Sequence, residues 1–590
     1  MPAKLGATRM ASMMRAGPFA AVGLAASVVV GCAQMAQDRA QLPTAPDNIV
    51  YTASGSFLAA QHAQRTRDVA AAADYSLRGL EAEPNNIDFL GRAHPALVEA
   101  GRIDEAAVVA AKLVAYDPSY TPAHLTLAVV EMRADQLEAA RARLTRLPIQ
   151  GVNRLVHPLM IAWIDMALGR PAAALNSLRP VQEVQGFRSM HDYHAGLMNE
   201  LAGRFDDAEA AYRRAIEGDA VAPPRLIEAF GGFLERRGRP AEARALYLRV
   251  RGTQGDSPIV RAGLARTAGG GAPGPAPALS TANGLAGAGE ALANLAAAFR
   301  QENTVSLALA YARLGLYLNP NDAAALANAG DILDQLDQRD KADALYMRVD
   351  PASPYGFAAR LRVAENLHET GNTDAAVRML DQIAAERPDR IEPLVTMGNA
   401  LREKERFVEA AAAYGRAIAR LGVPEARHWS LFYVRGIAFE RAKNWPAAEQ
   451  HFKRALELQP DQPDVLNYLA YTWVDKGLNI IEAERMLKRA VELRPNSGHI
   501  VDSLAWAYFR LGRFEEAVPL LERAVELLPQ DAVVLDHLGD GLWRVGRQLE
   551  ATFQWKRALD NNPEPELKIE IEKKLRGGLP PLAPAPAATR

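Results

Sequence analysis

Residues 497–529 read SGHIVDSLAWAYFRLGRFEEAVPLLERAVELLP, a stretch that predicts two amphipathic helices joined by a tight turn. Its apolar residues recur three and four positions apart, which is the spacing of one helix face. Gly512 lies in the predicted turn, and Pro529 ends the second helix. Ala505 and Ala517 are small where the two helices must approach closely. Such a hairpin cannot bury its apolar face alone, so it needs a similar hairpin on each side.

The chain supplies these copies in register. Prolines that close successive units recur every 34 or 35 residues, at Pro460, Pro495, Pro529 and Pro563. Small residues occupy the packing position of the first helix at Gly398, Gly436, Ala470, Ala505 and Gly539. The second helix has a small, a large and a small residue in turn: Ala410, Tyr414, Ala417; Ala448, Phe452, Ala455; Ala483, Leu487, Ala490; Ala517, Leu521, Ala524; Ala551, Trp555, Ala558.

In period and in these positions the chain resembles the tetratricopeptide repeat family, whose units are helix–turn–helix hairpins of about 34 residues. The resemblance covers roughly 80% of the chain, in about fourteen units. It implies an all-α fold, an α–α superhelix (solenoid) whose first helices line a concave groove. It also implies a scaffold that binds partner proteins.

Changes in composition divide the chain into segments. Between residues 253 and 289 the sequence is rich in Gly, Ala and Pro and predicts a linker between two arrays. The predicted segments are a lipoprotein signal peptide (1–31), a flexible tether (32–50), an N-terminal array (51–252), the linker (253–289), a C-terminal array (290–563), a capping helix (564–576) and a disordered tail (577–590).

The N-terminus predicts export. Basic residues Lys4, Arg9 and Arg15 precede an apolar run over 19–30, which is too short for a permanent membrane span. The run leads into VVGC, which resembles the lipobox of bacterial lipoproteins and implies lipidation of Cys32. Several acyl chains would give stable anchoring in the cell envelope, because one chain alone binds membranes only marginally. The alternative is an ordinary signal peptide with a chance cysteine.

Ala33 follows that cysteine, and by analogy with enterobacterial sorting it favours the outer membrane facing the periplasm. The net charge of −2 becomes about −5 once the signal is removed, which does not suggest a nucleic-acid binder. The chain has a single cysteine, so it can form no intrachain disulfide.

No enzyme motif is recognisable, so we expect no catalytic residue, cofactor, metal or small-molecule substrate. His191 and His194 share a helix face, but no third metal ligand is evident. The groove-facing positions of the last repeats predict a partner-binding set: Asn399, Arg402, Tyr433, Asn467, Tyr471, Asp502, Trp506, Arg510, Asp536, Asp540, Trp543 and Arg544. The aspartates would favour a partner protein or extended peptide that carries Lys or Arg.

Three readings of the function stay open. The first is a non-catalytic, lipid-anchored scaffold in the bacterial cell envelope. The second is an accessory factor for outer-membrane assembly or for polysaccharide or protein export, in which the aromatic residues would stack on sugars. The third is an enzyme with an unrecognised site. Trp473, Tyr508 and Phe439 fall on the packing stripe and are expected in the core.

Overall fold

The computed structural model describes residues 52–218, 221–268, 276–279, 281–300 and 304–580. Within these ranges the regular structure is helical throughout and no strand is present, which confirms the predicted all-α fold. None of the helices in this part of the chain is long and apolar enough to cross a membrane. The predicted signal peptide, Cys32, the tether and the last ten residues of the tail lie outside the described residues.

The chain divides into two compact units, with the boundary between Ala376 and Val377. We call them the N-terminal unit and the C-terminal unit. Helix α20 (Thr373–Glu386) contains the boundary. The N-terminal unit contains α2 (Ala53–Arg65), α3 (Val69–Ala82), α4 (Ile87–Ala100), α5 (Ile103–Tyr116), α6 (Thr121–Arg133), α7 (Leu137–Thr145), α8 (Asn153–Ala167), α9 (Pro171–Leu178), η3 (Arg179–Glu183), α10 (Arg188–Leu201), α11 (Phe205–Gly218), α12 (Pro224–Arg236), α13 (Pro240–Gln254), α14 (Pro258–Arg266), α15 (Gly284–Ala298), α16 (Val305–Leu318), α17 (Ala323–Gln335), α18 (Arg339–Tyr346) and α19 (Gly356–Glu369).

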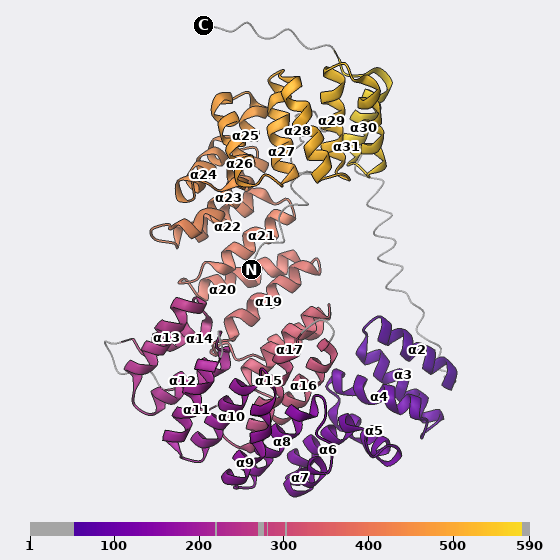
Figure 1. The fold of residues 1–590 in the computed structure, drawn as a ribbon, viewed down its shortest axis with the longest axis vertical. Helices are drawn as coiled ribbons and strands as arrows, with labels where there is room; N and C mark the ends of the chain where they lie inside the picture. The colour runs from indigo at the N-terminus through magenta and orange to yellow at the C-terminus, as the bar shows by residue number, and fades with distance from the viewer. Residues whose placement is uncertain (1–51, 219–220, 269–275, 280, 301–303, 581–590) are drawn as a thin grey trace. The chain divides into compact units, whose positions relative to one another are not determined.

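The C-terminal unit continues the same alternation of helices to the end of the described chain (Figure 1). It contains α21 (Glu392–Glu403), α22 (Phe407–Ala419), η5 (Ala426–His428), α23 (Trp429–Arg441), α24 (Trp445–Leu458), α25 (Pro463–Lys476), α26 (Ile480–Leu493), α27 (Gly498–Arg510), α28 (Phe514–Leu527), α29 (Ala532–Arg544), α30 (Gln548–Asp560) and α31 (Pro565–Gly577).

Successive helices pack as hairpins, for example α4 with α5, α10 with α11 and α29 with α30. We call the first helix of each hairpin its A helix and the second its B helix. Residues 497–529 form one of these pairs, α27 and α28. Gly512 takes the left-handed conformation between them, with φ of 74°, and the N–H of Arg513 closes the turn on the Tyr508 oxygen at 2.9 Å.

A large ring from the B helix lies directly over a glycine of the A helix in several repeats. A Cβ on Gly330 would lie 2.5 Å from the Tyr346 ring, and one on Gly398 would lie 2.4 Å from Tyr414. The hydroxyl of Tyr414 then donates to Asn399 at 2.8 Å. The glycine therefore leaves room for the ring between the two helices. The hydroxyl group of the ring finds its hydrogen-bond acceptor on the A helix.

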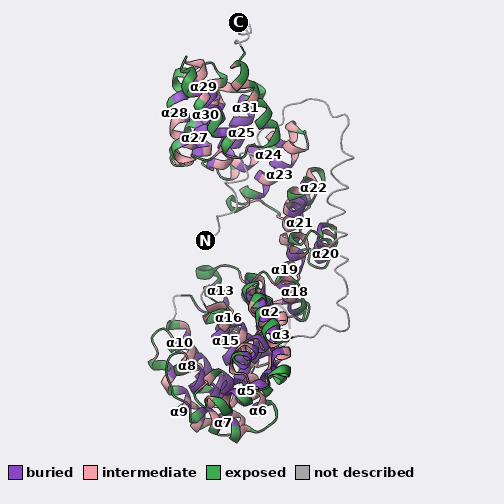
Figure 2. Ribbon diagram, turned by 90° about the vertical axis from the view of Figure 1, so that its right-hand side faces the viewer, coloured by how far each residue is buried: buried purple, intermediate pink, exposed green. Residues whose placement is uncertain are grey.

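The residues predicted for the hairpin cores are buried as expected. The three predicted B-helix positions in the repeats of α22, α24, α26, α28 and α30 are all completely inaccessible to solvent. Figure 2 shows buried residues where helices face each other and exposed residues on the outward sides. Trp473 and Tyr508 are also buried, and Phe439 packs against the same core. The repeat register predicted from the sequence is therefore confirmed.

The segment predicted as a linker, 253–289, differs from that expectation. It contains α14, and the Gly- and Ala-rich sequence from residue 284 onward forms α15 instead of a loop. The reason is close packing, since a Cβ on Gly284 would lie 2.5 Å from Ala167 of α8. The boundary between the two compact units also falls later, after Ala376.

Helix α31 lies at the C-terminal end of the repeats, where the sequence predicts a capping helix. Leu567 and Ile571 are buried against the preceding repeat, and Leu575 packs partly against the same core. Most of the remaining residues of α31 are half-buried or exposed. This helix therefore covers the apolar end of the last hairpin and presents a polar side to solvent.

Candidate binding surfaces

The predicted partner-binding residues all lie on A helices of the C-terminal unit, on α21, α23, α25, α27 and α29. We call the surface lined by these five helices the C-terminal A face. Equivalent positions of successive repeats line up along such a surface. The predicted residues therefore form rows, and their burial differs from row to row.

One row consists of Tyr433, Asn467, Asp502 and Asp536, and all four residues are buried. The prediction that these side chains are exposed in a groove is wrong. The A helices pack against one another, as α25 does with α27 and α27 with α29, and this row lies in the interface between them. Burial raises the pKa of the Tyr433 hydroxyl well above its ordinary value.

The acidic residues of the surface already have cationic or polar partners within the chain. Asp502 receives a hydrogen bond from His537 Nδ1 at 2.9 Å. Lys574 of α31 donates to Asp536 at 2.8 Å and to Asp540 at 2.7 Å. These carboxylates therefore do not supply the open negative charge that led us to expect a basic partner.

The next row is only partly accessible. Tyr471 and Asp540 are buried, and Asn399 is half-buried beneath the hydroxyl of Tyr414. Trp506 is half-buried and stacks on two rings. Its ring centroid lies 4.6 Å from that of Phe509 and 3.9 Å from that of His537, with both pairs nearly parallel.

Sequence reasoning missed Phe509 and His537 as parts of this stack. Phe509 lies three residues after Trp506, a spacing that places both rings on the same side of α27. His537 comes from α29 and could be placed only by the packing of successive A helices. The result is a stack of three nearly parallel rings on the C-terminal A face.

The remaining predicted residues lie along the edge of the same surface. Arg510 is exposed and donates to Asp475 at 2.9 Å. Arg544 donates to the Pro580 oxygen at 2.8 Å, and the half-buried Trp543 packs against Trp555 with ring centroids 5.3 Å apart. Arg402 is half-buried on α21. Arg510 is therefore the cation of the predicted set that is most open to a partner.

The A helices of the N-terminal unit are not open in the same way, because the chain's own helices lie on them. Helix α15 packs on α8, and α16 packs on α4 and α6. Figure 1 shows α15 and α16 beside these helices. Arg313 of α16 donates to the main-chain oxygen of Glu99 at 3.2 Å, and Arg133 of α6 donates to that of Tyr317. We call this covered surface the N-terminal A face.

The closest approach on the covered face joins Trp163 of α8 to Gly287 of α15. A Cβ on Gly287 would lie 2.0 Å from the indole ring. Trp163 precedes its B-helix alanine, Ala174, by as many residues as Trp506 precedes Ala517. The two tryptophans thus occupy the same repeat position, one completely covered by a helix and the other half-buried.

A buried ionic cluster fixes α15 in place. Glu290 of α15 receives hydrogen bonds from Tyr193 at 2.8 Å and from Arg225 Nε at 3.1 Å. Arg225 also donates to Asp322, the N-cap residue of α17, at 2.9 Å. Burial alone would raise the pKa of Glu290, but attraction to Arg225 brings it below its ordinary value. The cluster specifies the position of α15 on α10 and α12.

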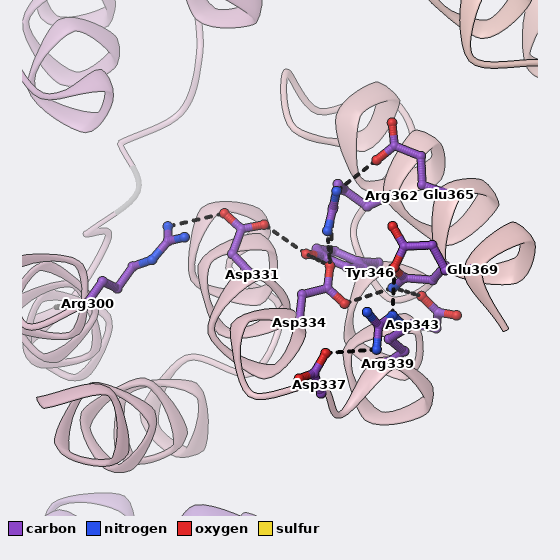
Figure 3. A network of polar contacts seen from close by, with 11 residues as sticks. Arg300, Asp331, Asp334, Asp337, Arg339, Asp343, Tyr346, Arg362, Glu365 and Glu369 are labelled. Atoms are coloured by element: carbon purple, nitrogen blue, oxygen red, sulfur yellow. Dashed lines mark hydrogen bonds and ion pairs between the residues drawn. The ribbon is translucent and has the colours of Figure 1, made fainter. Parts of the chain in front are cut away.

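A second polar network joins α17, α18 and α19 (Figure 3). The hydroxyl of Tyr346 bridges Asp331 and Asp334 at 2.8 and 2.9 Å. Asp334 also receives hydrogen bonds from Arg362 at 2.7 Å and from Asn366 at 2.8 Å. Because these carboxylates are occupied by neighbouring side chains, we interpret the network as a link between hairpins.

The two histidines noted in the sequence, His191 and His194, contact different side chains. His194 is completely buried and accepts from Trp163 Nε1 at 3.2 Å, and burial lowers its pKa to about 3. His191 lies instead against Asp192 at 3.2 Å. No group of three metal-ligating side chains with suitable geometry is found among the described residues.

Comparison with known proteins identifies the repeat. Two tetratricopeptide repeat models match, one over residues 97–160 and 479–536 and the other over 159–223 and 395–463. Among solved structures, a tetratricopeptide repeat protein from Parabacteroides merdae is 18% identical, covering 43% of this chain and 98% of its own, with a TM-score of 0.36.

Two further structures have similar scores. YrrB, described as a TPR protein with an unusual peptide-binding site, is 20% identical over 33% of this chain and 97% of its own, with a TM-score of 0.27. The APC/C heterotetramer Cut9–Hcn1 is 13% identical over 90% of this chain and 96% of its own, with a TM-score of 0.35. No curated protein matches the chain.

Proposed function

We propose that this chain, which is a tetratricopeptide repeat protein, is a non-catalytic scaffold that holds segments of partner proteins on its C-terminal A face. The repeat is in general a protein-interaction fold. The observation that carries the proposal is the pair of equivalent tryptophans: Trp163 is covered by a helix of the chain itself, whereas Trp506 is half-buried. The C-terminal A face thus presents the same repeat position with the tryptophan half-buried.

The internal example favours a particular partner chemistry. Helix α15 meets Trp163 with Gly287, and the ring fits against the helix because no side chain intervenes. We infer that a partner helix or extended segment with small residues would meet the edge of the Trp506 stack in the same manner. Aromatic and arginine side chains are the residues that most often dominate binding energy at protein interfaces.

The stack supports a protein partner better than a sugar. A sugar ring would need an open aromatic face, and Trp506 already lies parallel to Phe509 and His537 at 4.6 and 3.9 Å. The acidic rows are internally paired through Lys574 and His537, so a strongly basic partner is not part of the proposal.

The test is a pull-down from crosslinked membranes of the natural host, with the partners identified by mass spectrometry. We expect Trp506→Ala to lose proteins that the wild-type chain recovers. Trp445→Ala is the matched control, because Trp445 is a half-buried tryptophan at the start of the B helix α24. Equal recovery by both variants and the wild type would remove the C-terminal A face from the proposal.

We also propose that the scaffold is attached to the bacterial envelope by lipid at Cys32, on the evidence of the sequence motif alone. A Cys32→Ser variant should keep its helical circular-dichroism spectrum and move from the membrane fraction to the soluble fraction. Retention of this variant in the membrane fraction by itself would end the anchoring proposal, without affecting the partner surface.

A further inference from the structure

A cavity of about 350 Å³ lies in the N-terminal unit, where α16 and the turn after α17 meet α4 and the turn between α2 and α3. We call it the Glu99 cavity. Its polar lining comes from Gln64, Arg67, Glu99, Ser306 and Gln338. Its apolar lining comes from Val69, Ala72, Pro95, Ala96, Val305 and Leu336. The cavity is a part of the N-terminal A face that the chain's own helices leave unfilled.

The Glu99 carboxyl group has no hydrogen-bond or ion-pair partner among the described residues, although it is largely withdrawn from water. Buried carboxylates are normally paired, so an uncompensated one that lines a cavity is a candidate ligand contact. Glu99 lies in the last turn of α4, where the negative end of the helix dipole adds no compensation.

Of the charged groups on the surrounding elements, Arg313 and Lys341 have partners elsewhere, whereas Arg67 lines the cavity. Arg313 of α16 donates to the main-chain oxygen of Glu99 and packs across the end of α4 at Gly101. Lys341 donates to the Gln338 oxygen at 3.0 Å and lies 4.0 Å from Asp68. Arg67 lines the cavity as an exposed residue, and its main-chain oxygen receives the Gln338 amide at 3.2 Å.

The residues that line the cavity favour an alkylammonium group over a divalent metal ion. A divalent metal needs several oxygen ligands. Here the amide oxygens of Gln64 and Gln338 already accept from Arg92 and Lys341. A single carboxylate beside six apolar residues matches an ammonium group on an alkyl stem, with the methylenes against the apolar wall.

We propose that the Glu99 cavity binds a primary alkylammonium group, with the Glu99 carboxylate as its counter-ion and the apolar wall around its stem. The group could be carried by a free amine or by a lysine side chain of a partner. Burial raises the pKa of Glu99 to about 7, so the site gains its charge as the pH rises through neutrality. The cavity is separate from the C-terminal A face, and either proposal can fail alone.

The experiment titrates the full chain with n-butylammonium chloride and observes the ligand by saturation-transfer NMR. We expect saturable binding in the millimolar range, no saturable binding of 1-butanol, and at least tenfold weaker n-butylammonium binding to Glu99→Gln. The affinity of the wild type should rise severalfold between pH 6 and pH 8. Glu105→Gln, which changes an exposed carboxylate paired with Arg102, should bind like the wild type.

A second titration uses the capped tripeptide acetyl-Gly-Lys-Gly-amide. Tighter binding of the peptide than of n-butylammonium would assign the site to a partner's lysine, and binding of n-butylammonium alone would assign it to a free amine. Equal affinity of Glu99→Gln and wild type, or equal binding of 1-butanol and n-butylammonium, would overturn the proposal. A helical circular-dichroism spectrum and an unchanged melting temperature at pH 6 establish that the variant is folded.

Discussion

Trp163 and Gly287, which come from helices far apart in the sequence, are packed so closely that a Cβ on the glycine would lie 2.0 Å from the indole. Trp163 is completely buried, and the neighbouring Gly284 makes a similar approach to Ala167. The contact shows how a repeat surface can bind a helix that has no side chain in the way. It also explains why a glycine-rich segment is ordered here.

The first prediction concerns this contact. Gly287→Ala should destabilise the N-terminal unit by about 1–3 kcal/mol, because the added methyl group forces Trp163 or α15 to shift. Hydrogen exchange should accelerate in α15 and α8. Gly91→Ala is the control, since a Cβ at this helical position meets nothing within 4 Å and should stabilise by up to about 1 kcal/mol. Equal effects of the two substitutions on denaturant unfolding would contradict the close approach.

The second prediction concerns the C-terminal end. Lys574→Met should cost about 3–5 kcal/mol in the stability of the last repeat, because it removes the Lys574 cation that pairs with the buried Asp536 and Asp540. Limited proteolysis should then release α31 first. Lys573→Met removes an exposed lysine paired with Glu570 and should change stability by less than about 0.5 kcal/mol. Adding Asp536→Asn to Lys574→Met should restore part of the loss.

The third prediction separates packing from binding. Trp555→Ala should destabilise the C-terminal unit by about 3–5 kcal/mol, since this tryptophan is completely buried over Gly539. Trp506→Ala should cost less, because its ring is half-buried. Denaturant unfolding followed by circular dichroism tests the order. A larger loss for Trp506 would mean that its effect on partner recovery reports folding instead of contact.

The fourth prediction follows from the raised pKa of Glu99, about 7 in the folded chain. The folded state binds this proton more tightly than the unfolded state, so the wild type loses stability as the pH rises from about 4.5 to about 7. Glu99→Gln has no such group. Its stability relative to the wild type should therefore increase by up to about 3 kcal/mol between pH 5 and pH 8. A difference that is independent of pH would place the carboxyl in water.

The sequence was informative where the repeat constrains every residue. Ala517, Leu521 and Ala524 are predicted in the core and are completely buried, because periodic packing leaves no other place for them. The glycines of α15 were misleading, since the same composition suits a loop or a helix in close contact. Only the contact with Trp163 decides between these alternatives, and it joins residues too distant for local pattern reasoning.

The candidate site was less predictable for a similar reason. Spacing places Asp502 and Asp536 at equivalent positions of their helices, but their burial depends on the side chains of the next A helix, which packs over them. His537 and Lys574, which donate to them, were not recognisable as partners in the sequence. Trp506 is half-buried, and the rings stacked on it come from its own helix and from the next repeat.

The position of α15 and α16 also has a consequence for biosynthesis. The ribosome delivers α4, α6 and α8 before these covering helices, so Trp163 stays uncovered in the nascent chain until α15, which ends at Ala298, has been made. An open solenoid can fold one repeat at a time, but the N-terminal unit cannot complete its packing until α15 and α16 have been synthesised. Chaperones that act on the emerging polypeptide would meet that uncovered surface first.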